Sequence, residues 1–244
     1  MRMRKKKNGD RRRCNLDALF LTPEMLPFLN DGIYAFNAPL RLEIGCGKGD
    51  FVCGMSMQAP DFNYIALERV DDVILAAAEK YAYARVLGSL DPHGRWIGAD
   101  GAAYDGERCE IPLDMRGNVR FLRGDARIIV PLFPESSIDT VFANFSDPWP
   151  KKGYESRRLT YSERLIEYAR VLTPDGQFVM KTDNDGFFDY SMESVAAGPF
   201  EIIAWTRDVD SDPQFSRDNV ETEYERNFKN QGVKIKSLKA RVKK

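Results

Sequence analysis

The stretch that decides the fold is Leu40-Arg-Leu-Glu-Ile-Gly-Cys-Gly-Lys-Gly-Asp50, in which a short apolar run ends in closely spaced glycines. Such a run bounded by glycine predicts a buried strand. Gly45, Gly47 and Gly49 let the backbone turn sharply and approach a ligand without side-chain obstruction. The dinucleotide-binding fingerprint requires glycine at position 50, where this chain has Asp50, so the spacing disfavours a dehydrogenase.

Short apolar runs alternate with helical patterns along most of the chain. Helices are expected near 50–58, 71–87, 160–172 and 186–197, the third opened by a capping box at Thr160-Tyr-Ser-Glu163. Strands are expected over 40–45, 63–68, 118–124, 138–145, 176–183 and 200–206, and a final strand is expected after Glu223. This order predicts an α/β fold with a single doubly wound, mostly parallel Rossmann-like sheet and helices on both faces.

The charge distribution divides the chain into an acidic body and two basic ends. Residues 1–13 carry eight Lys and Arg and one acid, and residues 234–244 carry six and none, within a total of 36 Lys and Arg against 37 Asp and Glu. We expect a basic, flexible arm over 1–15, one domain over 16–232 with an inserted loop at 88–117, and a basic tail over 233–244. The ends are either contacts for a polyanion or solvated termini.

The chain's cysteines and its histidine exclude several kinds of site. The four cysteines have no CxxC spacing and are typical of reduced thiols in a cytoplasmic protein. His93 is the one histidine, which argues against Ser-His-Asp catalysis and histidine-rich metal sites. No secretory or membrane-spanning segment is expected, and neither a metal nor a membrane partner is predicted.

Acidic residues end three of the expected parallel strands. Glu43 lies in the first strand, Glu68 ends the second, and Asp125 follows the third. Each one alone is either a turn residue, a helix cap or a ligand-binding group. Together they favour a nucleoside cofactor, with Glu68 accepting hydrogen bonds from ribose hydroxyls and Asp125 near the adenine. Glu43 favours a cationic ligand, and S-adenosylmethionine has that charge.

Four motifs are similar to those of a known family. Residues 43–49, EIGCGKG, resemble the glycine-rich motif of class I methyltransferases, and FSDPWPKK (145–152) with RRLT (157–160) resembles the signature of the bacterial tRNA (guanine-N7-)-methyltransferases. KTDN (181–184) and TEYE (222–225) are similar to that family's two later substrate motifs. The resemblance implies a class I methyltransferase fold and transfer of a methyl group from S-adenosylmethionine to a guanosine in the tRNA variable loop.

The resemblance also implies a role for each matching residue. The cofactor would be bound by the glycine turn and by Glu43, Glu68, Asp125 and Asp147, and Asp147 would also be catalytic. The substrate would be bound by Lys151, Asp183, Thr222, Glu223, Tyr224 and Glu225. RNA would contact the basic loop through Lys152, Gly153, Tyr154, Arg157 and Arg158. Gly153-Tyr154 departs from the family's common Arg-His and weakens the charge of this loop.

The residues suit methylation at guanine N7. N7 has a lone pair and no proton, so the enzyme needs no base to deprotonate it, in agreement with the single His93. A carboxylate at Asp147 would stabilise the positive charge that grows on the ring, unless it only closes the turn. Asp183 or Glu225 would accept from the Watson–Crick edge of guanine, the alternatives being a helix cap for Asp183 and a surface charge for Glu225.

Two other functions fit some of the same features. A methyltransferase acting on another RNA base atom would keep the cofactor and change the nucleophile. A non-catalytic tRNA-binding subunit would keep the fold and lose the reaction, although Glu43, Glu68 and Asp147 argue against it.

Overall fold

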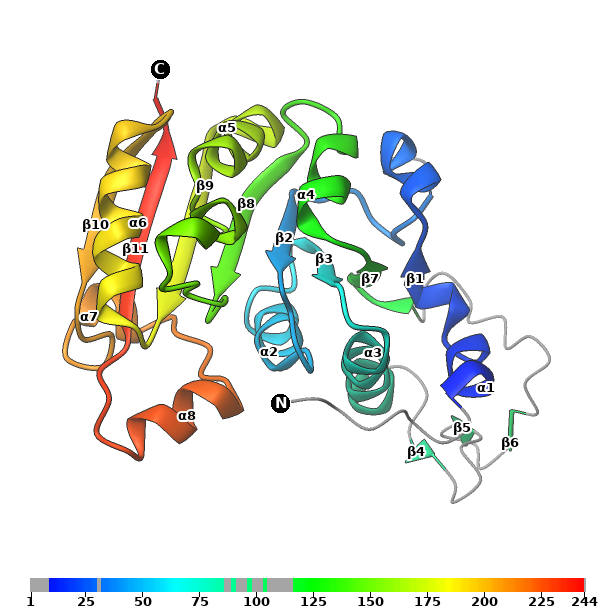
Figure 1. The fold of residues 1–244 in the computed structure, drawn as a ribbon. Helices are drawn as coiled ribbons and strands as arrows, with labels where there is room; N and C mark the ends of the chain where they lie inside the picture. Colours follow the sequence, from blue (N-terminus) through cyan, green and yellow to red (C-terminus); the bar gives the residue numbers. More distant parts are fainter. Residues whose placement is uncertain are drawn as a thin grey trace. The chain divides into compact units, whose positions relative to one another are not determined.

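The structure is a computed structural model that describes residues 9–29, 32–85, 89–90, 96–97, 103–104 and 116–243 (Figure 1). The first eight residues of the predicted arm, most of the predicted insert with His93 and Cys109, and Lys244 lie outside the described residues. Contacts within the chain cluster into two compact units. The N-terminal unit comprises Met1–Pro39 and Cys46–Ile129, and the C-terminal unit comprises Leu40–Gly45 and Val130–Lys244. Each is described by itself.

The N-terminal unit is built on three parallel strands in the order β1-β7-β3, comprising Phe20–Leu21, Val119–Arg123 and Asn63–Glu68. Tyr64 pairs with Val119 and Glu68 with Arg123, so the carboxyl ends of β3 and β7 lie at the same edge. Four of the five residues of β7 and five of the six residues of β3 are buried, as in a parallel sheet covered on both faces, and the buried residues of β7 include the charged Arg120.

Helices complete this unit. The helices are α1 (Gly9–Cys14), α2 (Asp50–Gln58), α3 (Asp71–Arg85) and α4 (Ala126–Ile129), with short 3-10 helices at Asp17–Leu19 and Pro23–Phe28. α3 packs on β3 and β7, and the ring of its buried Tyr81 lies edge-on to Phe121 at 6.0 Å. Arg12 and Arg13 of α1 pair with Glu79 and Asp71 of α3, so this part of the predicted arm is a docked helix.

The C-terminal unit is built on five strands in the order β2-β8-β9-β11-β10, comprising Leu40–Ile44, Ile138–Asn144, Leu172–Thr182, Lys236–Val242 and Phe200–Thr206. The first three are parallel, and β11 is antiparallel to both its neighbours. The predicted basic tail therefore contains a strand of this sheet. Its Lys236 and Ser237 are buried.

The helices of this unit are α5 (Ser162–Val171), α6 (Asp185–Ala197), α7 (Pro213–Ser216) and α8 (Glu223–Lys229), with 3-10 helices at Val130–Leu132 and at η5 (Lys152–Arg157). α6 packs along β9, β10 and β11 (Figure 1). The register pairs Glu43 with Phe142 and Asn144 with Lys181, so the carboxyl ends of β2, β8 and β9 share one edge.

The capping box predicted at 160–163 is wrong, because α5 begins at Ser162 and the Thr160 hydroxyl is bonded to that of Ser191 instead (2.8 Å). The alternative role of Asp183 as a helix cap is also wrong, since the N-cap of α6 is Asn184, whose side chain accepts from the Phe187 amide. The final strand expected after Glu223 is confirmed as β11, which begins at Lys236 after helix α8.

Within the predicted insert, the structure describes three two-residue strands, β4 (Ser89–Leu90), β5 (Trp96–Ile97) and β6 (Ala103–Tyr104). β4 pairs with β5, and β5 with β6, in antiparallel fashion.

Candidate functional site

The glycine turn after β2 has the left-handed backbone that its sequence predicts. Gly45, Gly47 and Gly49 have φ values of 76°, 55° and 79°, which other residues adopt only with strain. Gly49 is also required for packing, because a Cβ there would lie 2.8 Å from the Cβ of Ala77 on α3. A Cβ on Gly47 would meet nothing within 4 Å, so its backbone borders open space.

Glu68, in the N-terminal unit, is fixed beside the glycine turn. Its two carboxylate oxygens accept from the amides of Gly47 (3.3 Å) and Val70 (2.9 Å). A carboxylate has about four acceptor positions in all, so oxygen lone pairs remain for the hydroxyls of a ribose. The arrangement suits the predicted contact to a nucleoside.

Asp125 lies just after β7 at the same edge of this unit. It accepts hydrogen bonds from the backbone amide of Arg127 (3.0 Å) and from Nε (3.0 Å) and Nη2 (2.7 Å) of the Arg127 guanidinium. These bonds from Arg127 lower the pKa of the Asp125 carboxyl. Asp125 therefore holds the start of α4, and its contact with the adenine stays a prediction.

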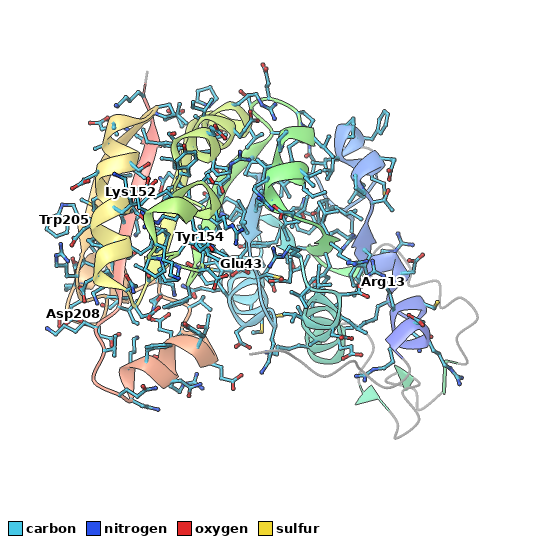
Figure 2. All side chains as sticks on the ribbon, viewed as in Figure 1. Arg13, Glu43, Lys152, Tyr154, Trp205 and Asp208 are labelled. Carbon is cyan, nitrogen blue, oxygen red and sulfur yellow. The ribbon has the colours of Figure 1, made fainter. Side chains whose placement is uncertain are left out.

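Glu43, in the C-terminal unit, is a buried carboxylate at the carboxyl end of β2. Asn144, at the end of the neighbouring strand β8, donates its amide to Glu43 at 3.5 Å. A buried carboxylate favours a cationic partner, because its charge has lost most of its hydration. Glu43, labelled in Figure 2, is thus suited to a ligand with an ammonium or sulfonium group.

The loop that carries Asp147 has an unusual backbone. Phe145 and Trp149 have φ values of 51° and 41°, a region that residues with side chains adopt rarely and at a cost of about 1–3 kcal/mol. The Phe145 amide donates to the Lys181 carbonyl (2.8 Å), and its ring packs against the cluster of Val209, Phe215 and Ile235. The surrounding structure thereby holds this loop in place and leaves Asp147 exposed.

Arg158 belongs to the interior of this loop and not to its surface. It is 8% exposed, and its guanidinium donates to the carbonyls of Pro148 and Trp149, both at 3.0 Å. The guanidinium also lies 4.0 Å from the centre of the Tyr190 ring. The prediction that Arg158 contacts RNA is therefore corrected: it fixes the turn next to Asp147.

The other predicted RNA-contacting residues lie on the surface. Lys151, Lys152, Gly153, Tyr154 and Arg157 are exposed, on and just before η5 (Figure 2). The Arg157 guanidinium lies 4.6 Å from the ring centre of Tyr154 and 4.9 Å from that of Trp149. This cluster presents a cation and two aromatic rings on one short segment, a combination that binds single-stranded nucleic acid.

Asp147, Asp183 and Tyr224 come from three separate segments of the C-terminal unit, and the two carboxylates influence the Tyr224 phenol. Partial burial raises the pKa of the Tyr224 phenol, and the charges of Asp183 and Asp147 raise it further. The Tyr224 ring is 47% exposed and packs between Phe145 (5.0 Å between centroids) and Phe228 (4.8 Å). An exposed aromatic face thus lies near two carboxylates.

The segment of Thr222 to Glu225 forms the start of α8. Thr222 is the N-cap, its hydroxyl accepting from the Glu225 amide (3.0 Å), and Glu223 is exposed. Glu225 is fully buried, and its oxygens are bound by Lys181 (2.6 Å), Asn219 (2.7 Å) and Lys229 (2.9 Å). It is not a surface charge, and these partners leave Asp183 as the better candidate to contact a base.

Within the described residues, the structure contains neither a metal cluster nor a membrane-spanning helix. No group of three or more His, Cys, Asp or Glu in this part of the chain has the arrangement that a metal ion needs. Among the helices described, none has both the length and the apolar character needed to span a membrane.

Comparison with known proteins identifies the family. Residues 37–238 match the model of a family described as putative methyltransferase. The chain is 36% identical over 208 residues to the tRNA (guanine-N(7)-)-methyltransferase of Lachnoclostridium phytofermentans, covering 85% of this chain and 83% of that protein. It is 34% identical to the Streptococcus thermophilus tRNA (guanine-N(7)-)-methyltransferase over the full length of both.

The chain belongs to the tRNA (guanine-N(7)-)-methyltransferase family. The crystal structure of the 16S rRNA methyltransferase KamB has the same fold, with a TM-score of 0.55 over 84% of this chain and 88% of that one, at 12% identity. The predicted Rossmann-like fold of a class I methyltransferase is confirmed.

Sequence reasoning missed the roles of Lys181 and Arg158. Both stand in motifs for which the sequence predicts contacts with substrate or RNA, and both are buried. One signal was present for Lys181, because it continues the buried strand Phe178-Val-Met-Lys-Thr182, where a charge needs a partner. The sequence contains no comparable signal for Arg158.

Proposed function

We propose that this protein transfers a methyl group from S-adenosylmethionine to N7 of a guanosine in tRNA. The observation that carries the proposal is the chain's membership of this family over most of its length, and the exposed ring of Tyr224 under the influence of Asp147 and Asp183 agrees with it. The guanosine is in the variable loop, as the resemblance of the motifs implies, and the protein acts on tRNA in the cytoplasm.

The attacking atom needs no help from a base. Guanine N7 carries a lone pair and no proton, so it attacks the methyl carbon directly. The protein's part is to hold the guanine in line and to exclude other orientations. The chain accordingly needs only a carboxylate at this place.

Asp147 is the catalytic residue. The guanine ring gains positive charge as the new bond to carbon forms, and a carboxylate already fixed beside it lowers the energy of that state. The strained backbone at Phe145 and Trp149 and the bonds from Arg158 support a fixed position for the loop. The face of Tyr224 is suited to the same cationic ring.

Asp183 distinguishes guanine from adenine. Guanine offers two donors on its Watson–Crick edge, N1–H and the N2 amine, and one carboxylate accepts both. Asp183 is half-buried at the end of β9, and its backbone carbonyl is held by Lys236 (3.0 Å). For a base to reach Asp183 it has to leave its stack.

Three carboxylates would contact S-adenosylmethionine. Glu68 and Asp125 would contact its nucleoside, and Glu43 its cationic part. The open space above Gly47 and the buried charge of Glu43 fit such a ligand. When bound, it supplies the methyl group on a sulfonium.

The tRNA backbone would be bound by the exposed cations Lys151, Lys152 and Arg157. Phosphate contacts set the position of the RNA without reading its sequence. Tyr154 would stack on a nucleotide in place of the charge that the family's usual Arg-His supplies.

The test is incubation of the purified protein with methyl-labelled S-adenosylmethionine and bulk tRNA, followed by nucleoside analysis. Label in 7-methylguanosine supports the whole proposal. Label in another nucleoside would keep the cofactor and refute N7 as the nucleophile. Binding of the cofactor without transfer would favour a non-catalytic tRNA-binding subunit.

A further inference from the structure

Lys181 is a buried cation with all its ammonium protons engaged. Its side chain is almost fully buried at the carboxyl end of β9, and Nζ donates to Glu225 (2.6 Å), Asn219 (2.8 Å) and the Val220 carbonyl (3.0 Å). An ammonium has three protons, so these bonds satisfy it. Lys181 therefore holds the segment that leads into α8 and leaves no donor for a phosphate.

The backbone of Lys181 holds a second segment. Its carbonyl accepts from the amide of Phe145, the residue with left-handed φ that begins the Asp147 loop. Its Nζ also lies 5.7 Å from the centre of the Phe145 ring. Asp183 follows two residues later on the same strand end. One residue thus connects the three segments that carry Asp147, Asp183 and Tyr224.

Glu225 completes the connection from the other side. It adjoins Tyr224 at the start of α8, where the Thr222 hydroxyl caps the helix through the Glu225 amide. Burial by itself would raise the pKa of Glu225, but Lys181, Lys229 and Asn219 together lower it, so the carboxylate is ionised when folded. An ionised buried pair has a strongly preferred geometry, because displacement of either charge leaves the other without its partner.

We propose that Lys181 and Glu225 are positioning residues that set the place of Tyr224 and of the Asp147 loop relative to the guanine. They touch neither the base nor the RNA backbone. This inference rests on the proposed function, since it assigns a task within the same site. It replaces the predicted substrate contact of Glu225 with an indirect role.

Lys229 offers a matched comparison. It pairs with the same carboxylate (2.9 Å) and also with Asp210 and Glu221, but it lies at the far end of α8. Lys229→Met removes a cation from Glu225, while Lys181 keeps its contacts with Asn219, Val220 and Glu225. A purely structural network would respond alike to the loss of either lysine.

The test compares three variants of the full chain. Lys181→Met/Glu225→Met replaces the ion pair by apolar side chains of similar length, an exchange that buried pairs often tolerate. Half-buried Asn219 then bonds to water. Glu225→Gln keeps the shape and an acceptor for Lys181 and serves if the double variant does not fold. Lys229→Met is the control. Each is measured for kcat, KM for tRNA, Kd for S-adenosylmethionine and cooperative unfolding.

We expect kcat of the double variant to fall about thirtyfold, because small misplacement of reacting groups costs up to about a hundredfold. KM for tRNA and the cofactor Kd should change less than about threefold. Glu225→Gln should lose kcat in the same direction, and Lys229→Met should keep it. A kcat within twofold of wild type in the folded variants would overturn the proposal, as would a loss confined to KM.

Amide hydrogen exchange separates this inference from the proposed function. Exchange in residues 145–150 and 222–226 should rise in the double variant and not in Lys229→Met. If the wild-type protein forms no 7-methylguanosine, the proposed function fails, and this exchange pattern alone decides the positioning role. Unchanged exchange in both segments would then overturn it.

Discussion

Glu68 in the N-terminal unit and Asp147 in the C-terminal unit are both carboxylates at or just beyond the ends of parallel strands, but the structure holds different parts of them. The Glu68 carboxylate itself accepts hydrogen bonds from the amides of Val70 and Gly47. Around Asp147 it is the backbone of the loop that is held, by the guanidinium of Arg158 and by the carbonyl of Lys181. The carboxylate is fixed directly in the first case and through its loop in the second.

The difference teaches how to interpret charges near a substrate motif. Lys151, Lys152, Arg157 and Arg158 form one basic run in the sequence, yet three are exposed and Arg158 is buried. A cation in such a loop either contacts the substrate or holds the backbone of the loop in place. Only the contacts of its donors decide between these roles.

Asp147→Asn should have the largest effect, since it removes the charge in the loop and keeps its shape. We expect turnover to fall about a hundredfold or more, the scale for a preorganised electrostatic group. Single-turnover methylation of tRNA is the measurement. Turnover close to that of the wild-type protein would show that Asp147 only closes the turn.

Asp183→Asn should impair the reaction with tRNA, and Glu68→Gln should weaken binding of the cofactor. We expect Asp183→Asn to lower kcat/KM for tRNA about tenfold to a hundredfold, the range for a lost bidentate contact to a base. Glu68→Gln should raise the cofactor Kd by about tenfold, because it weakens charge-assisted hydrogen bonds. Calorimetric titration with S-adenosylmethionine and kinetics with varied tRNA measure the two effects. If each variant impaired tRNA kinetics and cofactor binding equally, the separate roles of Asp183 and Glu68 would be contradicted.

Comparison of Arg158→Met with Lys152→Met separates two roles within one basic run: fixing the loop backbone and binding the RNA. Arg158→Met should lower kcat about tenfold, because two carbonyls next to Asp147 lose their donor. Lys152→Met should leave kcat unchanged. It should reduce the slope of log K for tRNA binding, plotted against log salt concentration, by about one. Salt-dependent tRNA binding by both variants is the check, and a changed slope in Arg158→Met would return that residue to the RNA interface.

Tyr224→Phe and Tyr224→Leu test the aromatic face. The phenylalanine variant keeps the ring and should stay within about threefold of wild-type kcat. The leucine variant should lose about tenfold, since contact of a cation with an aromatic face contributes about 1 kcal/mol or more when desolvated. Equal kcat in the two variants would indicate that the ring contributes packing only.

The smallest expected effect is on the pH dependence of stability. Because the folded pKa of Glu225 is lowered, its contribution is present above the unfolded value of about 4.3 and is lost as the pH falls through the lower folded value. The free energy of unfolding should therefore decrease below about pH 4.3. In Glu225→Gln the free energy of unfolding should decrease less steeply with falling pH, as measured by urea titrations at several pH values. A pH dependence parallel to that of the wild-type protein would contradict this.

Sequence alone could predict the elements and the cofactor-side residues because their signals are local. The strands at 63–68 and 200–206 have the predicted bounds, and the glycine turn has the predicted backbone. Arg158 and Glu225 could not be placed, because a motif does not say whether a charge points inward. The capping box failed for a similar reason: Ser191, 31 residues away, bonds the Thr160 hydroxyl.

Strand β11 has a consequence for how the C-terminal unit folds. It lies between β9 and β10, so β10 joins this sheet only through a strand that begins 30 residues after β10 ends. Pairing of distant segments slows folding, since the chain loses entropy before the contacts form. Lys236 of this strand also binds the Asp183 carbonyl. On refolding, recovery of methyl transfer should lag behind recovery of helical signal.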